Sequence, residues 1–176
     1  MRVIGGEFRS RRLRTPPGLG TRPTPDRLRE SLFNILTPRI ENTVFADLYA
    51  GSGSVGIEAL SRGARQAIFV ERSRGCLDLI RSNLADLALT SRALVLAGAA
   101  ASRLEGIEAD IHFVDPPYER AEEYERVLDA LGRRGRGLVV VQHASRAKLA
   151  QRYGSLALTR QVRQGDNTLS FYEPVA

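Results

Sequence analysis

The stretch VFADLYAGSGSVG, residues 44–56, decides the fold of this chain. It opens with the short apolar segment Val44–Leu48, typical of a buried strand, and continues into a loop whose glycines follow the pattern G-x-G-x-x-G. Helical spacing then runs from about Val55 to Arg62 and ends at Gly63. A strand, a tight glycine turn and a helix in this order predict the first unit of a parallel α/β sheet.

Apolar segments and helical patterns alternate along the rest of the chain. Further strands are expected at Ala67–Val70, Ala93–Ala97, Ile111–Val114 and Leu138–Val141, and helices at about Ser73–Leu87, Ala121–Leu131 and Ala147–Tyr153. The last two alternating segments, Leu156–Val162 and Thr168–Tyr172, are joined by a turn at 164–167 and predict an antiparallel hairpin. The fold class is therefore α/β and Rossmann-like, with a mostly parallel sheet that ends in a C-terminal antiparallel hairpin.

The first 40 residues differ from the rest in charge. They hold nine arginines and three acids, whereas residues 41–176 hold 17 cations and 17 acids. Thr24 as N-cap, Pro25 at the first helical position and Pro38 at the end bound a predicted helix in this segment. We expect an Arg-rich N-terminal extension over 1–40 and a catalytic domain over 41–176. A basic segment on a neutral body is typical of proteins that bind a nucleic-acid backbone, here through Arg9, Arg11, Arg12, Arg22 and Arg27.

The composition excludes several classes of protein. No apolar run approaches the roughly 20 residues that a membrane span needs. The one cysteine, Cys76, cannot form an intramolecular disulfide and falls in a predicted helix, so we expect it to pack there and the protein to be cytoplasmic. No His/Cys cluster has the spacing of metal ligands, so no metal is expected.

The glycine loop and two acids indicate a cofactor that contains adenosine. Glu71, at the end of the second strand, can accept hydrogen bonds from both hydroxyls of a ribose. Asp47 suits an ammonium group and would repel a pyrophosphate, which favours S-adenosylmethionine over a nicotinamide dinucleotide. Arg72 is a weak signal for a 2′-phosphate instead. The candidate cofactor residues are Asp47, Tyr49, Ala50, Gly51, Ser52, Gly53, Glu71 and Arg72.

A second motif, Asp115-Pro116-Pro117-Tyr118, follows the fourth strand. Successive prolines fix the backbone, so the Pro116 carbonyl can point into the cleft as an acceptor beside the Asp115 carboxylate. These two acceptors and the Tyr118 ring suit the exocyclic amino group of a nucleobase, and we expect all four residues of the motif to be catalytic. Accepting both amino hydrogens would aim the nitrogen lone pair at an electrophilic methyl group.

Asp-Pro-Pro-Tyr after such a glycine loop resembles the amino-methyltransferases of DNA and RNA. Further stretches resemble, in order, the RsmD-type 16S ribosomal RNA guanine-N2 methyltransferases; they are residues 1–11, 21–24 with 27–34, 50–53 with 60–64, and 165–168. The resemblance implies a class I methyltransferase that uses S-adenosylmethionine and methylates N2 of a guanine in 16S rRNA, free or in an assembling small subunit. We expect it to act as a monomer.

Two features depart from the family's pattern. The family usually has an acid near the end of the third strand, but residues 96–100, LAGAA, offer none, so the backbone around Ala99 and apolar packing would hold the adenine. After the fifth strand the chain has Gln142-His143 where Glu-His is common.

Three alternatives stay open. A nicotinamide-dependent oxidoreductase would use the same glycine loop. A methyltransferase of adenine N6 or cytosine N4, on DNA or RNA, would use the same Asp-Pro-Pro-Tyr motif. An RNA-binding assembly factor without catalytic activity would keep the basic extension.

Overall fold

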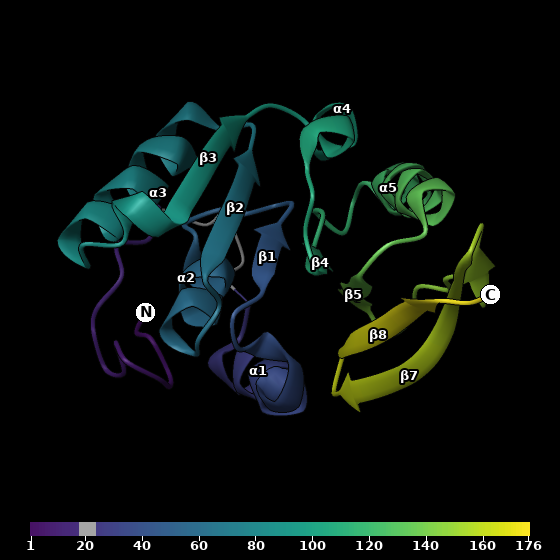
Figure 1. Cartoon of the computed structure of the whole chain (residues 1–176). Coiled ribbons are helices and arrows are strands. Elements are labelled where there is room, and N and C mark those ends of the chain that lie inside the picture. The colour runs from purple at the N-terminus through teal and green to yellow at the C-terminus, as the bar shows by residue number, and fades with distance from the viewer. Residues whose placement is uncertain (18–23) are drawn as a thin grey trace.

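The computed structural model describes residues 1–17 and 24–176 and contains a single mixed sheet between two layers of helices (Figure 1). The strands are β1 (Val44–Asp47), β2 (Gln66–Glu71), β3 (Ala93–Ala97), β4 (Ile111–Val114), β5 (Leu138–Ala144), β6 (Arg152–Tyr153), β7 (Leu156–Gln164) and β8 (Asn167–Pro174). The helices are α1 (Asp26–Ile40), α2 (Ser54–Ser61), α3 (Arg74–Asp86), α4 (Ala100–Arg103) and α5 (Ala121–Arg134), with short 3-10 turns at Thr90–Arg92 and Leu104–Gly106.

The strand order is β3-β2-β1-β4-β5-β8-β7-β6. The first five are parallel, and β8, β7 and β6 are each antiparallel to the strand before them in this order. The predicted parallel sheet with a C-terminal hairpin is therefore confirmed. The chain reverses its direction of winding between β1 and β4, where Asp47 lies beside Phe113. In such sheets ligands bind beyond the carboxyl ends of the strands at this point.

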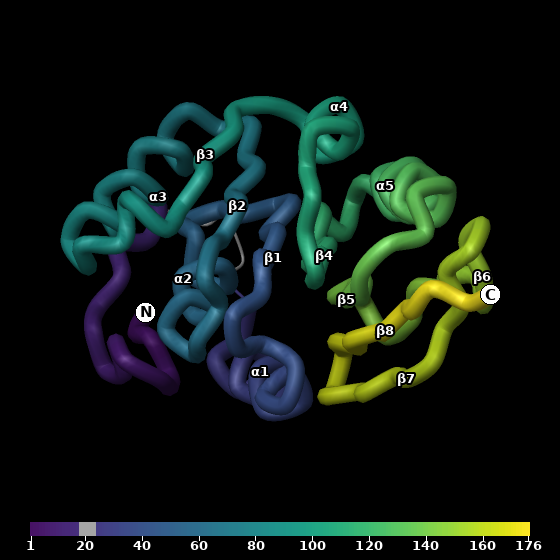
Figure 2. The backbone as a smooth tube through the Cα atoms, viewed as in Figure 1, coloured from purple at the N-terminus to yellow at the C-terminus, as the bar shows by residue number. Residues whose placement is uncertain are grey.

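Alternate residues of the central strands face the two layers of helices. Phe45 and Phe113 pack with α1 and α2, while Ala46 and Val114 pack with α4 and α5. The third helix, α3, packs beside α2 against Phe69 of β2. Figure 2 follows α1 and α5 to opposite sides of the sheet. Because both faces are covered, β5 is buried over almost its whole length, as its run of valines predicts.

The first residues of the chain lie against α2 and α3. Arg2 and Arg12 form an antiparallel bridge, and the Val3 N–H donates to the Arg11 carbonyl at 2.9 Å. The side chains of Val3 and Leu13 are buried in the same cluster as apolar residues of α2 and α3. Residues 2–13 are therefore anchored by apolar burial as well as by backbone hydrogen bonds.

The structure corrects three local predictions. Thr24 is not the N-cap of α1, because Pro25 holds that position and no side chain caps the helix. Pro38 lies inside α1 rather than at its end, since the buried side chain of Ile40 holds the last turn against the core. The helix predicted near Ala147–Tyr153 is absent; the segment instead leads into β6, where Tyr153 is buried and pairs with Leu156 of β7.

Candidate active site

The glycine loop connects β1 to α2 at the carboxyl edge of the sheet. Gly53 precedes α2 with a φ of 85°, a conformation that favours glycine. Gly56 allows α2 to approach β2, because a Cβ there would lie 2.3 Å from Cε1 of Phe69. Two of the three glycines in the pattern thus serve the turn and the close helix–strand packing, as such loops require.

Asp47 ends β1 beneath this loop and is 1% exposed. Its Oδ2 accepts a hydrogen bond from the Gly56 N–H at 3.2 Å, whereas Oδ1 has no partner among the described residues. Burial raises the pKa of Asp47 to about 7; the Gly56 N–H opposes this shift, and the carboxylates of Asp115 and Glu71 add to it. A buried acceptor without a partner fits an ammonium group or a water bound beside the loop.

Glu71 ends β2 and orders the neighbouring backbone. Its Oε2 accepts from the Gly51 N–H at 2.7 Å, and its Oε1 accepts from the N–H groups of Arg72 and Ser73 at 2.8 and 2.9 Å. The carboxylate is therefore fixed between the glycine loop and the start of α3. Oε2 keeps a lone pair for a further donor such as a ribose hydroxyl, whereas both lone pairs of Oε1 are engaged by the backbone.

Asp115 follows β4 and is half-buried. The Thr24 hydroxyl donates to its Oδ2 at 3.4 Å. Burial raises the pKa of Asp115 to about 7, and the hydrogen bond from Thr24 opposes the shift. Because Asp47 pairs with Phe113 and the Leu48 N–H donates to the Phe113 carbonyl at 3.0 Å, the Asp-Pro-Pro-Tyr turn lies next to the glycine-lined edge.

Tyr118 closes the motif against the C-terminal hairpin. Its hydroxyl donates to Oδ1 of Asn167 at the start of β8. Between Asp115 and Tyr118, Pro116 is buried and Pro117 is exposed, and the Pro117 carbonyl accepts from the Arg120 N–H at 2.9 Å. The half-buried ring of Tyr118 is thus held at a defined position beside Asp115.

The other candidate cofactor residues occupy varied positions. The Tyr49 hydroxyl donates to Oε2 of Glu123 on α5 at 2.9 Å, so that side chain points toward α5. Ala50 and Ser52 are nearly buried within the loop, and Arg72 is exposed. Ala99 precedes α4, and the N–H of its neighbour Gly98 donates to the Glu71 carbonyl at 3.0 Å, which brings this backbone next to Glu71.

The side chain of His143 has no free ring nitrogen. Its Nδ1 pairs with the Ala144 carbonyl at 2.9 Å and its Nε2 with the Ser170 hydroxyl at 2.7 Å. Burial lowers the pKa of His143. A neutral imidazole engaged at both nitrogens supports the sheet and supplies no charge to the site.

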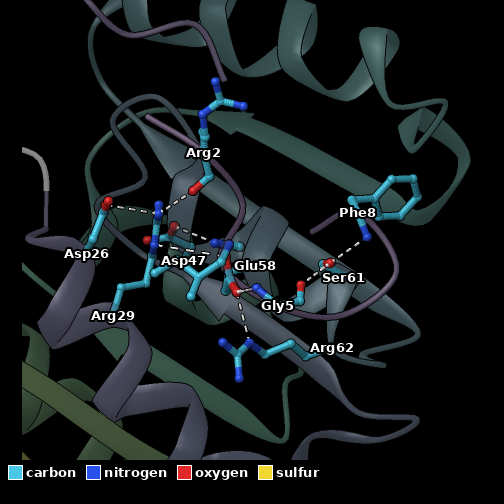
Figure 3. A network of polar contacts seen from close by, with 11 residues as sticks. Arg2, Gly5, Phe8, Asp26, Arg29, Asp47, Glu58, Ser61 and Arg62 are labelled. Carbon is cyan, nitrogen blue, oxygen red and sulfur yellow. Dashed lines mark hydrogen bonds and ion pairs between the residues drawn. The ribbon is translucent and has the colours of Figure 1, made fainter. Parts of the chain in front are cut away.

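The candidate RNA-binding arginines Arg9, Arg11, Arg12 and Arg27 are exposed, and Arg22 lies outside the described residues. Arg29, which the charge count placed with them, is fully buried. Its Nη2 donates to the Arg2 carbonyl at 2.5 Å and to Oδ1 of Asp26 at 3.2 Å (Figure 3). Arg29 is therefore part of the anchor of the N-terminal segment and is not accessible to a nucleic acid.

The residue that completes this anchor is Glu58 of α2, which is also fully buried. Its two oxygens accept from the N–H groups of Ile4 and Gly5, each at 2.9 Å, and Oε1 also accepts from Nε of Arg62 at 2.8 Å. Nε of Arg29 lies 4.0 Å from Oε2. Figure 3 shows how these groups converge on the one carboxylate.

Sequence reasoning missed two residues that hold the motif. Thr24 was expected to cap α1, and Asn167 was expected only to belong to a turn. Asn167 lies in the stretch 165–168 that carried the family resemblance, so that pattern was the available signal for it. The contact between Thr24 and Asp115 joins residues far apart in the chain and has no local signature.

Within residues 1–17 and 24–176, no helix has the length and hydrophobicity to cross a membrane. The same residues contain no group of three or more His, Cys, Asp or Glu side chains arranged to hold a metal ion.

The chain is similar to known proteins over nearly its full length. The family model described as "Conserved hypothetical protein 95" matches residues 1–173. A Bacillus subtilis protein named "Putative rRNA methyltransferase YlbH" is 35% identical over 98% of each chain. The Escherichia coli "Ribosomal RNA small subunit methyltransferase D" is 42% identical over 68% of this chain and 61% of its own length.

A solved structure agrees with these matches. The Escherichia coli structure titled "Putative methyltransferase yhhF" superposes with a TM-score of 0.85 and 35% identity, covering 100% of this chain and 98% of the other. The class I methyltransferase fold that the sequence predicts is thereby confirmed. The full-length family match and this structural likeness show that the chain belongs to the RsmD-type methyltransferase family.

Proposed function

We propose that this protein transfers a methyl group from S-adenosylmethionine to the exocyclic N2 of a guanine in 16S ribosomal RNA. The observation that carries the proposal is the convergence of Asp47, Glu71 and Asp115 at one edge of the sheet, beside the glycine loop. The names of the relatives support an rRNA substrate. The choice of guanine N2 rests on the family resemblance of the Asp-Pro-Pro-Tyr motif and of the stretches around it.

The cofactor would be held by residues of β1, β2 and the loop after β3. Oδ1 of Asp47, the acceptor without a partner, would receive the ammonium of the methionine moiety directly or through a water. Glu71 would accept from a ribose hydroxyl through Oε2, and the backbone around Ala99 would contact the adenine. When bound, S-adenosylmethionine supplies an electrophilic methyl group on sulfur.

The Asp115 carboxylate and the Pro116 carbonyl would accept the two hydrogens of the guanine amine. Two acceptors hold the amine in one orientation and draw its lone pair out of conjugation with the ring. Thr24 orients the carboxylate, and Asn167 fixes the aromatic plane of Tyr118 on which the base stacks. Stacking is worth about 1–3 kcal/mol per base, which offsets part of the cost of taking the guanine out of an RNA helix.

The exposed arginines of residues 1–40 would bind the RNA backbone. Because Val3 and Leu13 are buried with the core, this extension presents its cations from a fixed position relative to the site. We expect the protein to work as a cytoplasmic monomer on free rRNA or on an assembling small subunit. Neutralising Arg9, Arg11 and Arg12 tests the backbone contact better than deleting the segment, because deletion would also expose core residues.

The function is tested with RNA and subunits from a strain that lacks the gene. Purified protein and labelled S-adenosylmethionine are added separately to the naked 16S rRNA and to small subunits, and modified nucleosides are identified by mass spectrometry. We expect N2-methylguanine at one position. Methylated adenine N6 or cytosine N4 would contradict the base assignment, and calorimetric binding of a nicotinamide dinucleotide instead of S-adenosylmethionine would contradict the reaction class.

A further inference from the structure

A second basic region follows α5, although the net charge of residues 41–176 is zero. The chain has no acidic residue between Asp129 and Asp166, yet this interval holds eight cations. The count over residues 41–176 is neutral only because the acids lie elsewhere in that range. The fold determines where these eight charges point.

The sheet divides the cations of this interval between its two edges. Arg133 and Arg136 precede β5. Arg152 of β6 pairs with Ala157 of β7, which in turn pairs with Glu173 near the end of β8. All three arginines therefore lie at the amino edge of the parallel strands. Arg146 follows β5, and Arg163 lies one residue before the end of β7, so both lie at the carboxyl edge. Arg146, Arg163 and Lys148, which is two residues after Arg146 in the chain, are termed the hairpin cations below.

The hairpin cations are tied to the Asp-Pro-Pro-Tyr turn by a short chain of contacts. Ser145, next to Arg146, donates its N–H to the Asp166 carbonyl at 2.8 Å, and its hydroxyl pairs with that of Thr168 at 2.9 Å. Thr168 is the cross-strand partner of Arg163. Its neighbour Asn167 accepts the hydrogen bond from the Tyr118 hydroxyl. The tip of the hairpin therefore contacts the candidate active site through Asn167 and Tyr118.

The same hairpin tip also contacts α1. Nε2 of Gln164 donates to the Ser31 hydroxyl at 2.5 Å, and Arg27 lies one helical turn before Ser31 on the same face of α1. Figure 2 shows the turn between β7 and β8 beside α1. The exposed Arg27 and the hairpin cations therefore lie on the same side of the candidate active site.

The hairpin cations are available to a ligand. Arg146, Lys148 and Arg163 are exposed, and none of them forms an ion pair within the described part of the chain. Arg163 donates through Nε to the Gly165 carbonyl at 3.1 Å, which fixes part of its side chain and leaves its two terminal nitrogens without a hydrogen-bond partner among the described residues. Three exposed cations against the one exposed acid of the hairpin tip, Asp166, leave a net positive surface of the kind that binds phosphates.

The exposed cations of residues 2–14 lie on the other side of the site. Nδ2 of Asn83 on α3 donates to the carbonyls of both Arg14 and Ser52, each at 3.0 Å, so the N-terminal segment adjoins the glycine loop. In the strand order, the loop after β1 and the hairpin tip at β8 are separated by β4 and β5. The Asp-Pro-Pro-Tyr turn, which follows β4, lies between them.

We infer that the hairpin cations form a second RNA-backbone contact, which binds the phosphates on the side of the target nucleotide opposite to Arg9, Arg11 and Arg12. This inference rests on the proposed RNA substrate. An RNA strand held on both sides presents the nucleotide between the two contacts to Asp115 and Tyr118. Backbone contacts of this kind position a substrate without reading its sequence.

The test compares two triple variants that remove the same charge from the same acid-free interval. In one, Arg146, Lys148 and Arg163 are changed to Gln; in the control, Arg133, Arg136 and Arg152 are changed to Gln. Of these six residues, Arg136 forms an exposed ion pair, with Glu108 at 3.5 Å, which contributes little to stability. Steady-state methylation of unmethylated 16S rRNA is measured over a range of salt concentrations, together with cofactor binding by calorimetry.

We expect the hairpin variant to raise the KM for RNA roughly tenfold or more and to reduce the slope of log KM against log salt by about two to three. Its kcat at saturating RNA and its cofactor affinity should stay within about twofold of the parent, because a uniform binding contact is lost. The control variant should match the parent in all four quantities.

Three results would overturn the inference while leaving the proposed function intact. The hairpin variant could keep the parent's KM and salt slope, the control could show the same loss, or the hairpin variant could lose kcat and cofactor affinity with no change in KM. Failure of the parent protein to methylate 16S rRNA at all would instead refute the proposed function. The two ideas therefore fail in different ways.

Discussion

The hydroxyl of Thr24 donates a hydrogen bond of 3.4 Å to Oδ2 of Asp115, a residue 91 positions further along the chain. Thr24 directly precedes Pro25 and α1, and Asp115 directly follows β4. The contact joins the N-terminal segment to the Asp-Pro-Pro-Tyr turn, and within residues 1–17 and 24–176 it is the one hydrogen bond that opposes the raised pKa of Asp115. The protonation of the proposed catalytic carboxylate is thus controlled partly by the N-terminal segment.

Replacing Thr24 with Val should move the acid limb of the pH profile of kcat/KM for RNA to higher pH. The carboxylate form of Asp115 accepts the amine hydrogens, so kcat/KM should fall as the pH drops through about 7, the pKa of Asp115 in the free protein. Losing a hydrogen bond to the charged form raises that pKa further, by about half a unit for a long contact of this kind. Thr24→Ser keeps a hydroxyl and should leave the limb in place. Equal profiles for Val and Ser would refute the positioning role.

Replacing Asp115 with Asn should reduce kcat by about 10²- to 10³-fold, because an amide supplies a donor where the amine requires an acceptor. Cofactor affinity should be kept or slightly improved, since the charge of Asp115 raises the pKa of Asp47 and its removal favours the Asp47 carboxylate. Single-turnover kinetics and calorimetry measure the two effects. Asp129→Asn, on the exposed face of α5, is the matched control. A parallel loss of cofactor binding in Asp115→Asn would contradict the division of roles.

Cofactor binding should release a proton from Asp47. With a pKa of about 7, roughly half of the Asp47 side chains are protonated at pH 7, and an ammonium group beside Oδ1 would stabilise the charged form. Calorimetry in two buffers of different ionisation enthalpy should detect a release of about half a proton at pH 7, which vanishes as the pH rises well above the pKa. Asp47→Asn should bind more weakly and release none. Proton uptake by the parent protein would show that the ammonium lies elsewhere.

Local sequence patterns were sufficient to predict the central sheet. β3 and β4 begin and end at the predicted residues, because each is a short apolar run between clear turn or helix signals. The same reasoning failed for Ala147–Tyr153, where most residues are good helix formers but pairing with β7 decides the structure. Tertiary contacts override local preference most easily in such short segments.

The site was predictable where its residues sit at strand ends, and not where they come from distant segments. Asp47, Glu71 and Asp115 follow from the order of strands and loops alone. Thr24 and Asn167 act through contacts with residues far away in the sequence. A charge count likewise cannot separate the buried Arg29 from the exposed Arg27, because neighbouring residues of a helix face different environments.

The contacts of the buried Glu58 carboxylate predict how its removal changes the free energy of unfolding. It accepts from the Ile4 and Gly5 N–H groups and is paired with Arg62 and the fully buried Arg29. Arg29 also binds the Arg2 carbonyl, so the two charges together hold the N-terminal segment on α1 and α2 (Figure 3). Removing one partner of a buried pair leaves the other charge without compensation.

Glu58→Ala should therefore lower the free energy of unfolding by about 3–5 kcal/mol and expose residues 1–17 to proteases. The double variant Glu58→Leu with Arg29→Met removes both charges and should recover part of that loss, because no uncompensated charge then remains in the core. Denaturant unfolding measures the energies, and limited proteolysis measures the release of the segment. If the double variant were less stable than Glu58→Ala, the stranded charge of Arg29 would not be the main cause of the loss, and the Arg29 hydrogen bonds to the Arg2 carbonyl and to Asp26 would contribute more than that charge costs.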